Sequence, residues 1–130
     1  MAMHAMVIDD SRAMRLILKR IAGQLGFEVS EAANGKEALD LLAAAQSTPE
    51  LALVDWNMPE MNGLEFVTAV RADPKYRTMT LMMVTTESEH GQIVRALAAG
   101  AHEYVIKPFT PDAIIDKLAL LGLVPNGVAA

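Results

Sequence analysis

The sequence predicts an α/β protein built around a five-stranded parallel sheet, and three observations predict that fold. Short apolar runs alternate with longer segments of helical period, which is typical of repeated β-α units. The chain has 130 residues, a usual size for one domain. Hydrophobic residues make up 52% of it but aromatic residues only 5%, so the core is expected to be aliphatic and rich in methionine. We expect a single domain over 1–130, with a core over about 4–122 and a short C-terminal tail.

Five apolar runs are the predicted strands. They cover 5–8, 27–30, 51–54, 81–84 and 104–106. Runs of this length, separated by helical segments, are typical of buried parallel strands.

The clearest predicted helix lies between the first two strands. Ser11 is expected to be its N-cap and Gly26 its end. Its inward face is predicted from apolar positions at helical spacing, which are Met14, Ile17, Leu18, Ile21 and Leu25.

Four further helices are predicted from start and stop signals. The second, 36–45, follows Asn34-Gly35; the third, 64–72, follows Gly63; the fourth, 91–99, ends at Gly100. The last opens with Thr110-Pro111-Asp112, which supplies an N-cap, a first-turn proline and a dipole-favourable acid, and it closes at Gly122. The predicted inward residues of the second and last helices are Ala38, Leu41, Leu42, Ile114, Ile115, Leu118 and Leu121.

Composition excludes several classes of protein. The chain has no cysteine, so disulfides and thiol chemistry are excluded. Its first residues carry no basic signal region, and no apolar stretch is long enough to cross a membrane. The net charge of -5 opposes binding to nucleic acid. We expect a cytoplasmic protein with no nucleic-acid or membrane partner.

Chemically active side chains follow four of the five predicted strands. Asp9 and Asp10 follow the first, Asp55 the third, Thr85 and Thr86 the fourth, and Lys107-Pro108 the fifth. The carboxyl ends of parallel strands meet at one edge of a sheet, where ligands usually bind. These side chains are therefore expected to form one site.

Three carboxylates at one edge would repel one another unless a cation lay among them. Oxygen ligands and retained waters favour Mg²⁺, and an ionised Asp55 beside a metal and Lys107 is equipped to accept a phosphoryl group. Taken singly, Asp9 and Asp10 are better explained as caps beside Ser11, and Lys107 as a solvated strand end. The combination favours a site. His4, His90 and His102 show no ligand spacing and are expected at the surface.

In this order, these residues resemble the receiver domains of two-component response regulators, and most closely their stand-alone chemotaxis members. Residues 55–65, Asp-Trp-Asn-Met-Pro-Glu-Met-Asn-Gly-Leu-Glu, resemble the acceptor loop, and 107–110, Lys-Pro-Phe-Thr, the last active-site loop. The resemblance covers nearly the whole chain. It implies a flavodoxin-like, doubly wound sheet of order 2-1-3-4-5 with helices on both faces.

The resemblance also implies a role for each site residue. Asp55 would be the phosphoacceptor, and Asp10, Asp55 and the backbone carbonyl of Asn57 the direct ligands of Mg²⁺, with Asp9 acting through metal-bound water. Thr85 and Lys107 would contact phosphoryl oxygens, and Tyr104 would change rotamer as part of the switch. Asn57 and Glu87 would control the access of water that dephosphorylates the site, and the Lys107-Pro108 peptide would be cis. Tyr104 is equally well explained as a half-buried strand aromatic.

The implied partners are a histidine kinase as phosphodonor, a downstream protein such as a flagellar motor switch protein, and a phosphatase. The chain would be a monomeric signalling protein that catalyses only its own phosphorylation and dephosphorylation. Residues 88–92, Ser-Glu-His-Gly-Gln, lack the lysines that enterobacterial chemotaxis receivers carry at the start of the fourth helix. A phosphorelay or phosphate-sink receiver is therefore the alternative.

Two other classes of protein fit the residues less well. A haloacid-dehalogenase-type phosphatase also has an aspartate nucleophile, but it needs a second acid two residues later, where this chain has Asn57. A flavodoxin-like FMN binder needs a hydroxyl-rich or glycine-rich phosphate loop after the first strand. Asp9 and Asp10 would repel that phosphate.

Overall fold

The sheet of the computed structural model, which describes residues 3–123, has the predicted topology. Its strands are β1 (His4–Ile8), β2 (Glu28–Ala32), β3 (Leu51–Val54), β4 (Thr80–Thr85) and β5 (Glu103–Ile106). All neighbouring pairs are parallel, in the order β2-β1-β3-β4-β5. The predicted fold class and strand order are confirmed. The predicted C-terminal tail lies mostly outside the described residues.

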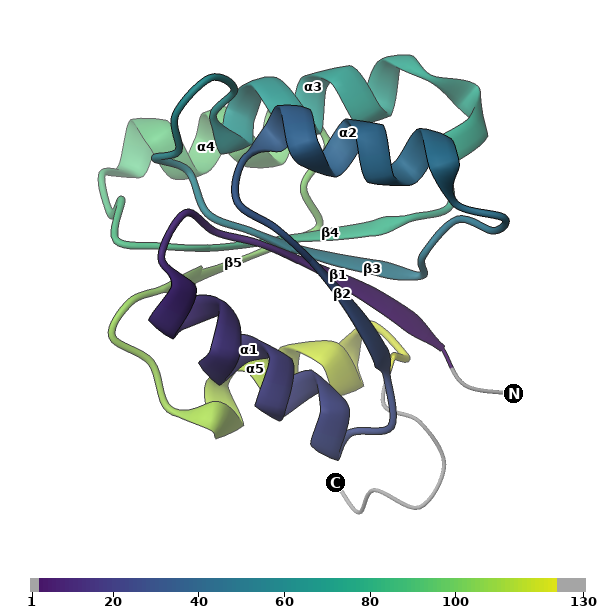
Figure 1. Cartoon of the computed structure of the whole chain (residues 1–130). Coiled ribbons are helices and arrows are strands. Elements are labelled where there is room, and N and C mark those ends of the chain that lie inside the picture. The colour runs from purple at the N-terminus through teal and green to yellow at the C-terminus, as the bar shows by residue number, and fades with distance from the viewer. Residues whose placement is uncertain (1–2, 124–130) are drawn as a thin grey trace.

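Helices cover both faces of the sheet (Figure 1). They are α1 (Arg12–Gln24), α2 (Gly35–Ala44), α3 (Gly63–Ala72), α4 (His90–Ala99) and α5 (Pro111–Leu120), with a short 3₁₀ turn, η1 (Pro74–Tyr76), after α3. Figure 1 shows α2, α3 and α4 on one face and α1 and α5 on the other. Within residues 3–123, no helix has the length and apolar character needed to span a membrane.

Side-chain caps fix where three of the helices begin. The Ser11 hydroxyl accepts the Met14 N–H at 3.2 Å, as the N-cap prediction requires. Asn34 caps α2, and Asn62 forms a reciprocal capping box with Glu65 at α3. Thr110 occupies the N-cap position of α5, but its hydroxyl makes no capping bond. The loops that carry the site are thus anchored by caps at α1 and α3.

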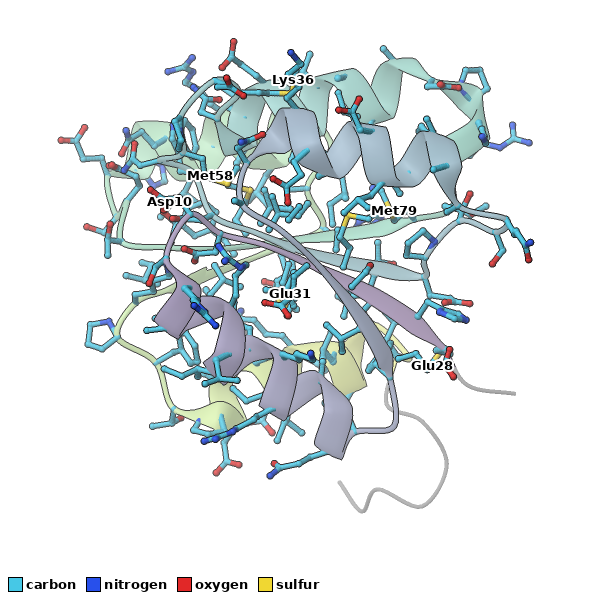
Figure 2. All side chains as sticks on the ribbon, viewed as in Figure 1. Asp10, Glu28, Glu31, Lys36, Met58 and Met79 are labelled. Carbon is cyan, nitrogen blue, oxygen red and sulfur yellow. The ribbon has the colours of Figure 1, made fainter. Side chains whose placement is uncertain are left out.

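The outer strand β2 is a charged edge. Glu28 and Glu31 lie along it (Figure 2), and β2 pairs only with β1. Charged side chains on an edge strand oppose pairing with another chain. β2 therefore contributes to the sheet without presenting an apolar edge.

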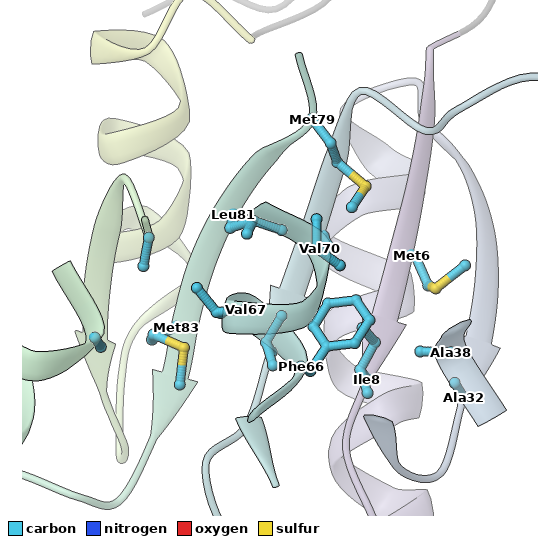
Figure 3. Packing of buried hydrophobic residues seen from close by; sticks show 14 of the residues in the cluster. Met6, Ile8, Ala32, Ala38, Phe66, Val67, Val70, Met79, Leu81 and Met83 are labelled. Carbon is cyan, nitrogen blue, oxygen red and sulfur yellow. The ribbon is translucent and has the colours of Figure 1, made fainter. Parts of the chain in front are cut away.

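Two apolar clusters fill the space between the sheet and its helices. In the larger one, Phe66, Val67 and Val70 of α3 pack over Ile8 and the neighbouring strands, and all four are fully buried (Figure 3). Burial of each such side chain stabilises the fold by roughly 1.5–3 kcal/mol. Both faces of the central strands are thus covered, which explains why these strands are apolar throughout.

Three details of the sequence prediction are wrong. Ile17 and Leu41 were predicted to face inward, but they are 46% and 37% exposed. The buried face of α1 includes Ala22 instead of Ile17, so the helix is rotated about its axis relative to the prediction. The second strand runs over Glu28–Ala32 rather than 27–30, because its pairing with β1 continues as far as Ile8.

Arg71 and His102 join four segments at the amino edge of the sheet, opposite the predicted site. The Arg71 guanidinium donates to the carbonyls of Gly100 at 3.0 Å and Met79 at 2.7 Å. Its Nη2 lies 3.2 Å from His102 Nδ1, which also accepts the Leu81 N–H at 3.2 Å. Nδ1 must therefore be unprotonated. Burial, and then the charge of Arg71, lower the pKa of His102. His102 is exposed as predicted, yet its ring is part of the fold.

This cluster predicts a pH-dependent contribution to stability. The folded-state pKa of His102 lies below its ordinary value of 6.5, so the unfolded chain binds the proton more readily. The contribution is complete above about pH 6.5 and is lost as the pH falls toward the folded-state pKa. His102→Asn retains an acceptor but does not titrate. We expect the unfolding free energy of wild type relative to His102→Asn to fall between pH 7.5 and 5 in urea titrations.

The exposed His90 at the start of α4 supplies the matched control. His90→Asn removes an imidazole outside this cluster, and its pH profile is the baseline with which that of His102→Asn is compared. An equal stability difference between wild type and His102→Asn at both pH values would contradict the assigned role of Nδ1.

Candidate functional site

The structure brings the three predicted carboxylates together at the carboxyl edge of the sheet. Asp9 and Asp10 follow β1, and Asp55 follows β3. One oxygen from each lies within 4.8 Å of the others. Asp9 and Asp55 are buried, whereas Asp10 is exposed at the mouth of the site (Figure 2). The predicted convergence of these strand ends is therefore present.

Asp9 is the most buried acid, with 1% of its surface exposed. Its Oδ1 accepts the Ser11 N–H at 2.9 Å, and its Oδ2 accepts from Lys107 Nζ at 2.7 Å. Oδ1 thus fixes the Ser11 backbone before α1, and the side chain that caps the helix is that of Ser11. The other oxygen holds the Lys107 amine, which is why Lys107 is not a solvated strand end.

Asp55 is 8% exposed and less fully compensated. Its Oδ1 accepts the Trp56 N–H at 2.8 Å, and its Oδ2 lies 3.6 Å from Lys107 Nζ. Burial raises the pKa of Asp55, and the charge of Asp9 raises it further. Hydrogen bonding from Thr85, the charge of Lys107 and the Trp56 N–H act in the opposite direction. Asp55 Oδ2 thus lies near the Lys107 amine but beyond hydrogen-bond distance from it.

Gly63 allows α3 to begin directly against the loop after Asp55. Its N–H donates to the Trp56 carbonyl at 2.8 Å. A Cβ atom at this position would lie 2.1 Å from the Asp55 carbonyl oxygen. Only glycine fits here without moving the backbone, and the residue that would move is Asp55 itself.

A chain of hydrogen bonds leads from the site toward β5. Thr85 is fully buried, and its hydroxyl accepts the Glu87 N–H at 3.4 Å. The Glu87 carbonyl accepts from the Tyr104 hydroxyl at 2.7 Å, and the Glu87 carboxylate accepts from the Asn57 amide. Tyr104 is 9% exposed, and burial is the main cause that raises its pKa. Glu87 therefore connects the loop after Asp55 with Tyr104.

Every predicted site residue lies in this region, and the Lys107-Pro108 peptide is cis, as the resemblance implies. The sequence prediction missed Arg15, whose guanidinium Nη1 donates to the Asp9 carbonyl at 2.7 Å. No spacing rule identifies such a contact, because α1 carries four basic residues of the same kind: Arg12, Arg15, Lys19 and Arg20. The chemical roles of all these residues stay predictions.

Three comparisons relate the chain to known proteins. The response regulator receiver domain model matches residues 5–119. The chain is 48% identical over 117 residues to a chemotaxis protein CheY homolog of Campylobacter jejuni, covering 89% of each chain. It is 44% identical over 120 residues to chemotaxis protein CheY1 of Helicobacter pylori, covering 92% of this chain and 96% of that one. The solved structure of Vibrio cholerae chemotaxis protein CheY4 matches with a TM-score of 0.84 at 32% identity, covering 92% of this chain and 98% of that one.

The close approach at Gly63 predicts that Gly63→Ala destabilises the fold. Overpacking of a close-packed position costs typically 1–3 kcal/mol, and more where the obstructing atom belongs to the backbone. Urea denaturation measures the loss. Gly91→Ala is the control, because Gly91 lies in α4 with nothing within 4 Å of an added Cβ. That variant should be as stable as wild type or up to about 1 kcal/mol more stable. Equal stability of the two variants would contradict the assigned constraint.

Proposed function

The chain belongs to the response regulator receiver domain family, as its sequence predicts, and we propose that it signals by phosphorylation of Asp55. Its similarity to chemotaxis proteins CheY indicates a receiver of CheY type and two-component signalling of the chemotaxis kind. The single observation that carries the proposal is the placement of Asp55 Oδ2 beside Lys107, within a cluster of three acids.

Asp9, Asp10 and Asp55 fit a hard divalent cation. Their oxygens lie close enough together to reach one ion, and carboxylates with retained water suit Mg²⁺. Asp10, Asp55 and the Asn57 carbonyl are the proposed direct ligands, with Asp9 acting through water. When bound, Mg²⁺ supplies positive charge to the oxygens of the transferring phosphoryl group.

Asp55 supplies the nucleophile. Its Oδ1 is held by the Trp56 N–H, so Oδ2 is the oxygen that forms the new P–O bond. The P–N bond of a phosphohistidine donor breaks, and the imidazole leaves with the electron pair and then takes a proton from solvent. Lys107 Nζ, 3.6 Å from Oδ2, stabilises the charge on the phosphoryl oxygens. Thr85 donates to another of these oxygens.

The same residues disfavour an enzyme that turns over external phosphoesters. Such an enzyme needs a general acid two residues after its nucleophile, and the Asn57 amide cannot supply that proton. The Asn57 side chain instead donates to Glu87 at the mouth of the site. We infer that this pair limits the access of water to the acyl phosphate. The acids after β1 likewise disfavour binding of FMN, since they would repel its phosphate.

The signal would leave through Tyr104 and the surface around it. A phosphoryl group on Asp55 replaces a carboxylate of charge -1 by an acyl phosphate with about one more negative charge. Its oxygens would draw in the Thr85 hydroxyl, whose own oxygen accepts the Glu87 N–H. A change in this loop reaches Tyr104 through the Glu87 carbonyl. Val94, Leu97 and Ile106 of α4 and β5 are 49%, 43% and 42% exposed, so the adjacent surface has apolar area for a target.

We propose a histidine kinase as the phosphodonor and a flagellar motor switch protein as the target. The chemotaxis names of the relatives support this target over the alternative, a phosphorelay or phosphate-sink receiver. Capture of partners by the phosphorylated chain separates the two. Recovery of a histidine phosphotransfer protein without a motor component would favour the alternative.

The only tryptophan, Trp56, reports directly on the proposed acceptor. We expect Mg²⁺ to change its fluorescence, and a small-molecule phosphodonor with Mg²⁺ to change it further and reversibly. Asp55→Asn should lose the response to the donor. Asp40→Asn, which removes an exposed carboxylate on α2, should respond as wild type does. A donor response in Asp55→Asn equal to that of wild type would show that the acceptor assignment is wrong.

A further inference from the structure

We propose that Arg15 is a positioning residue that orients Asp9 and Asp10 toward the cation. The inference rests on the proposed Mg²⁺ site and adds a residue that touches neither the metal nor the phosphoryl group. Arg15 lies one turn into α1, and its guanidinium reaches back to the backbone at the end of β1.

Two contacts hold the guanidinium in place. Nη1 donates to the Asp9 carbonyl at 2.7 Å, and Nε lies 3.3 Å from Glu31 Oε1 on β2. The Arg15 side chain is only 17% exposed. Lys19 Nζ lies 3.4 Å from the other Glu31 oxygen, so that carboxylate is held from both sides. The Arg15 guanidinium is therefore held in one orientation.

The Asp9 carbonyl lies where the backbone pattern changes. The Asp9 N–H still donates to Ala32 in β2 at 3.1 Å, which extends the sheet by one bond. The first backbone bond of α1 joins the Arg15 N–H to the Ser11 carbonyl at 2.9 Å. The Asp9 carbonyl takes part in neither the sheet bonds nor the helix bonds. Within residues 3–123, the donor of the hydrogen bond that it accepts is Arg15.

This bond determines the plane of the peptide that joins the two acids. The Asp9 carbonyl belongs to the Asp9–Asp10 peptide, so its direction sets the direction in which Asp10 leaves the backbone. The Asp9 side chain is already fixed by Ser11 and Lys107, whereas the Asp10 side chain is exposed. Arg15 is thus the contact that aligns Asp10 with Asp9 and Asp55.

Charge and geometry predict opposite effects when Arg15 is removed. A nearby positive charge repels Mg²⁺, so loss of the charge alone would strengthen metal binding. Loss of an outer contact that orients a ligand weakens metal affinity by typically 10–100-fold. Weaker binding after removal of a cation therefore indicates positioning rather than charge.

The test measures the Mg²⁺ dissociation constant from Trp56 fluorescence in Arg15→Met and Arg20→Met. Both variants remove one charge from α1, and Arg20 is exposed on that helix. We expect about tenfold or greater weakening in Arg15→Met and no weakening in Arg20→Met. Arg15→Lys should lie between wild type and Arg15→Met, because a lysine keeps the charge but not the two-donor fork.

Urea denaturation of the same variants separates positioning from a structural tie between α1 and β2. The proposal would be overturned if Arg15→Met had a lower unfolding free energy than wild type but the same Mg²⁺ dissociation constant as Arg20→Met. Should Arg15→Met not fold, Glu31→Leu removes the acceptor of the same contact, and unchanged Mg²⁺ affinity in that variant and in Arg15→Lys would also overturn the proposal. A wild type without any Mg²⁺ response would instead refute the proposed function on which the inference rests.

Discussion

The excess of negative charge at the carboxyl edge of the sheet is the constraint on which the rest of the structure depends. Asp9 and Asp55 are 1% and 8% exposed, and Lys107 is the amine that reaches both of them. The amine lies 2.7 Å from Asp9 but 3.6 Å from Asp55, so its charge is shared unequally. Buried carboxylates without full compensation cost stability. Binding of a cation near Asp55, or phosphorylation of its carboxylate, would therefore offset part of this cost.

The fold maintains this arrangement through rigid backbone rather than through side-chain packing at the site. Parallel strands fix where β1, β3, β4 and β5 end, and Gly63 brings α3 against the carbonyl of Asp55. Apolar layers on both faces keep the central strands in place. The Thr85, Glu87 and Tyr104 bonds then connect the site to one surface of the molecule. A local change in charge at Asp55 therefore has a physical route to a binding surface.

The alternating pattern predicted the strands, and the strand ends of a parallel sheet predicted the convergence of Asp9, Asp10, Asp55, Thr85 and Lys107. The strand order was predicted only by the resemblance to receiver domains. It did not predict the Arg15 contact with Asp9, the Asn57 bond to Glu87 or the contacts of Arg71 with His102. These contacts join different elements, so they depend on how each helix is rotated and which rotamer a long side chain adopts. The wrong placement of Ile17 and Leu41 has the same origin, since helical spacing defines a stripe only to within about one residue.

The most direct test of the charge constraint is the unfolding free energy of Asp55→Asn relative to wild type, measured without Mg²⁺ between pH 4 and 7. The folded-state pKa of Asp55 is raised above its ordinary value of 3.8, so the folded protein holds the proton more tightly than the unfolded chain. Wild type therefore loses stability as the pH rises through the folded-state pKa, and the amide variant does not. We predict that Asp55→Asn is the more stable protein at pH 7 and that its advantage shrinks toward pH 4. A variant that is less stable than wild type at pH 7, or a difference that does not change with pH, would contradict this account.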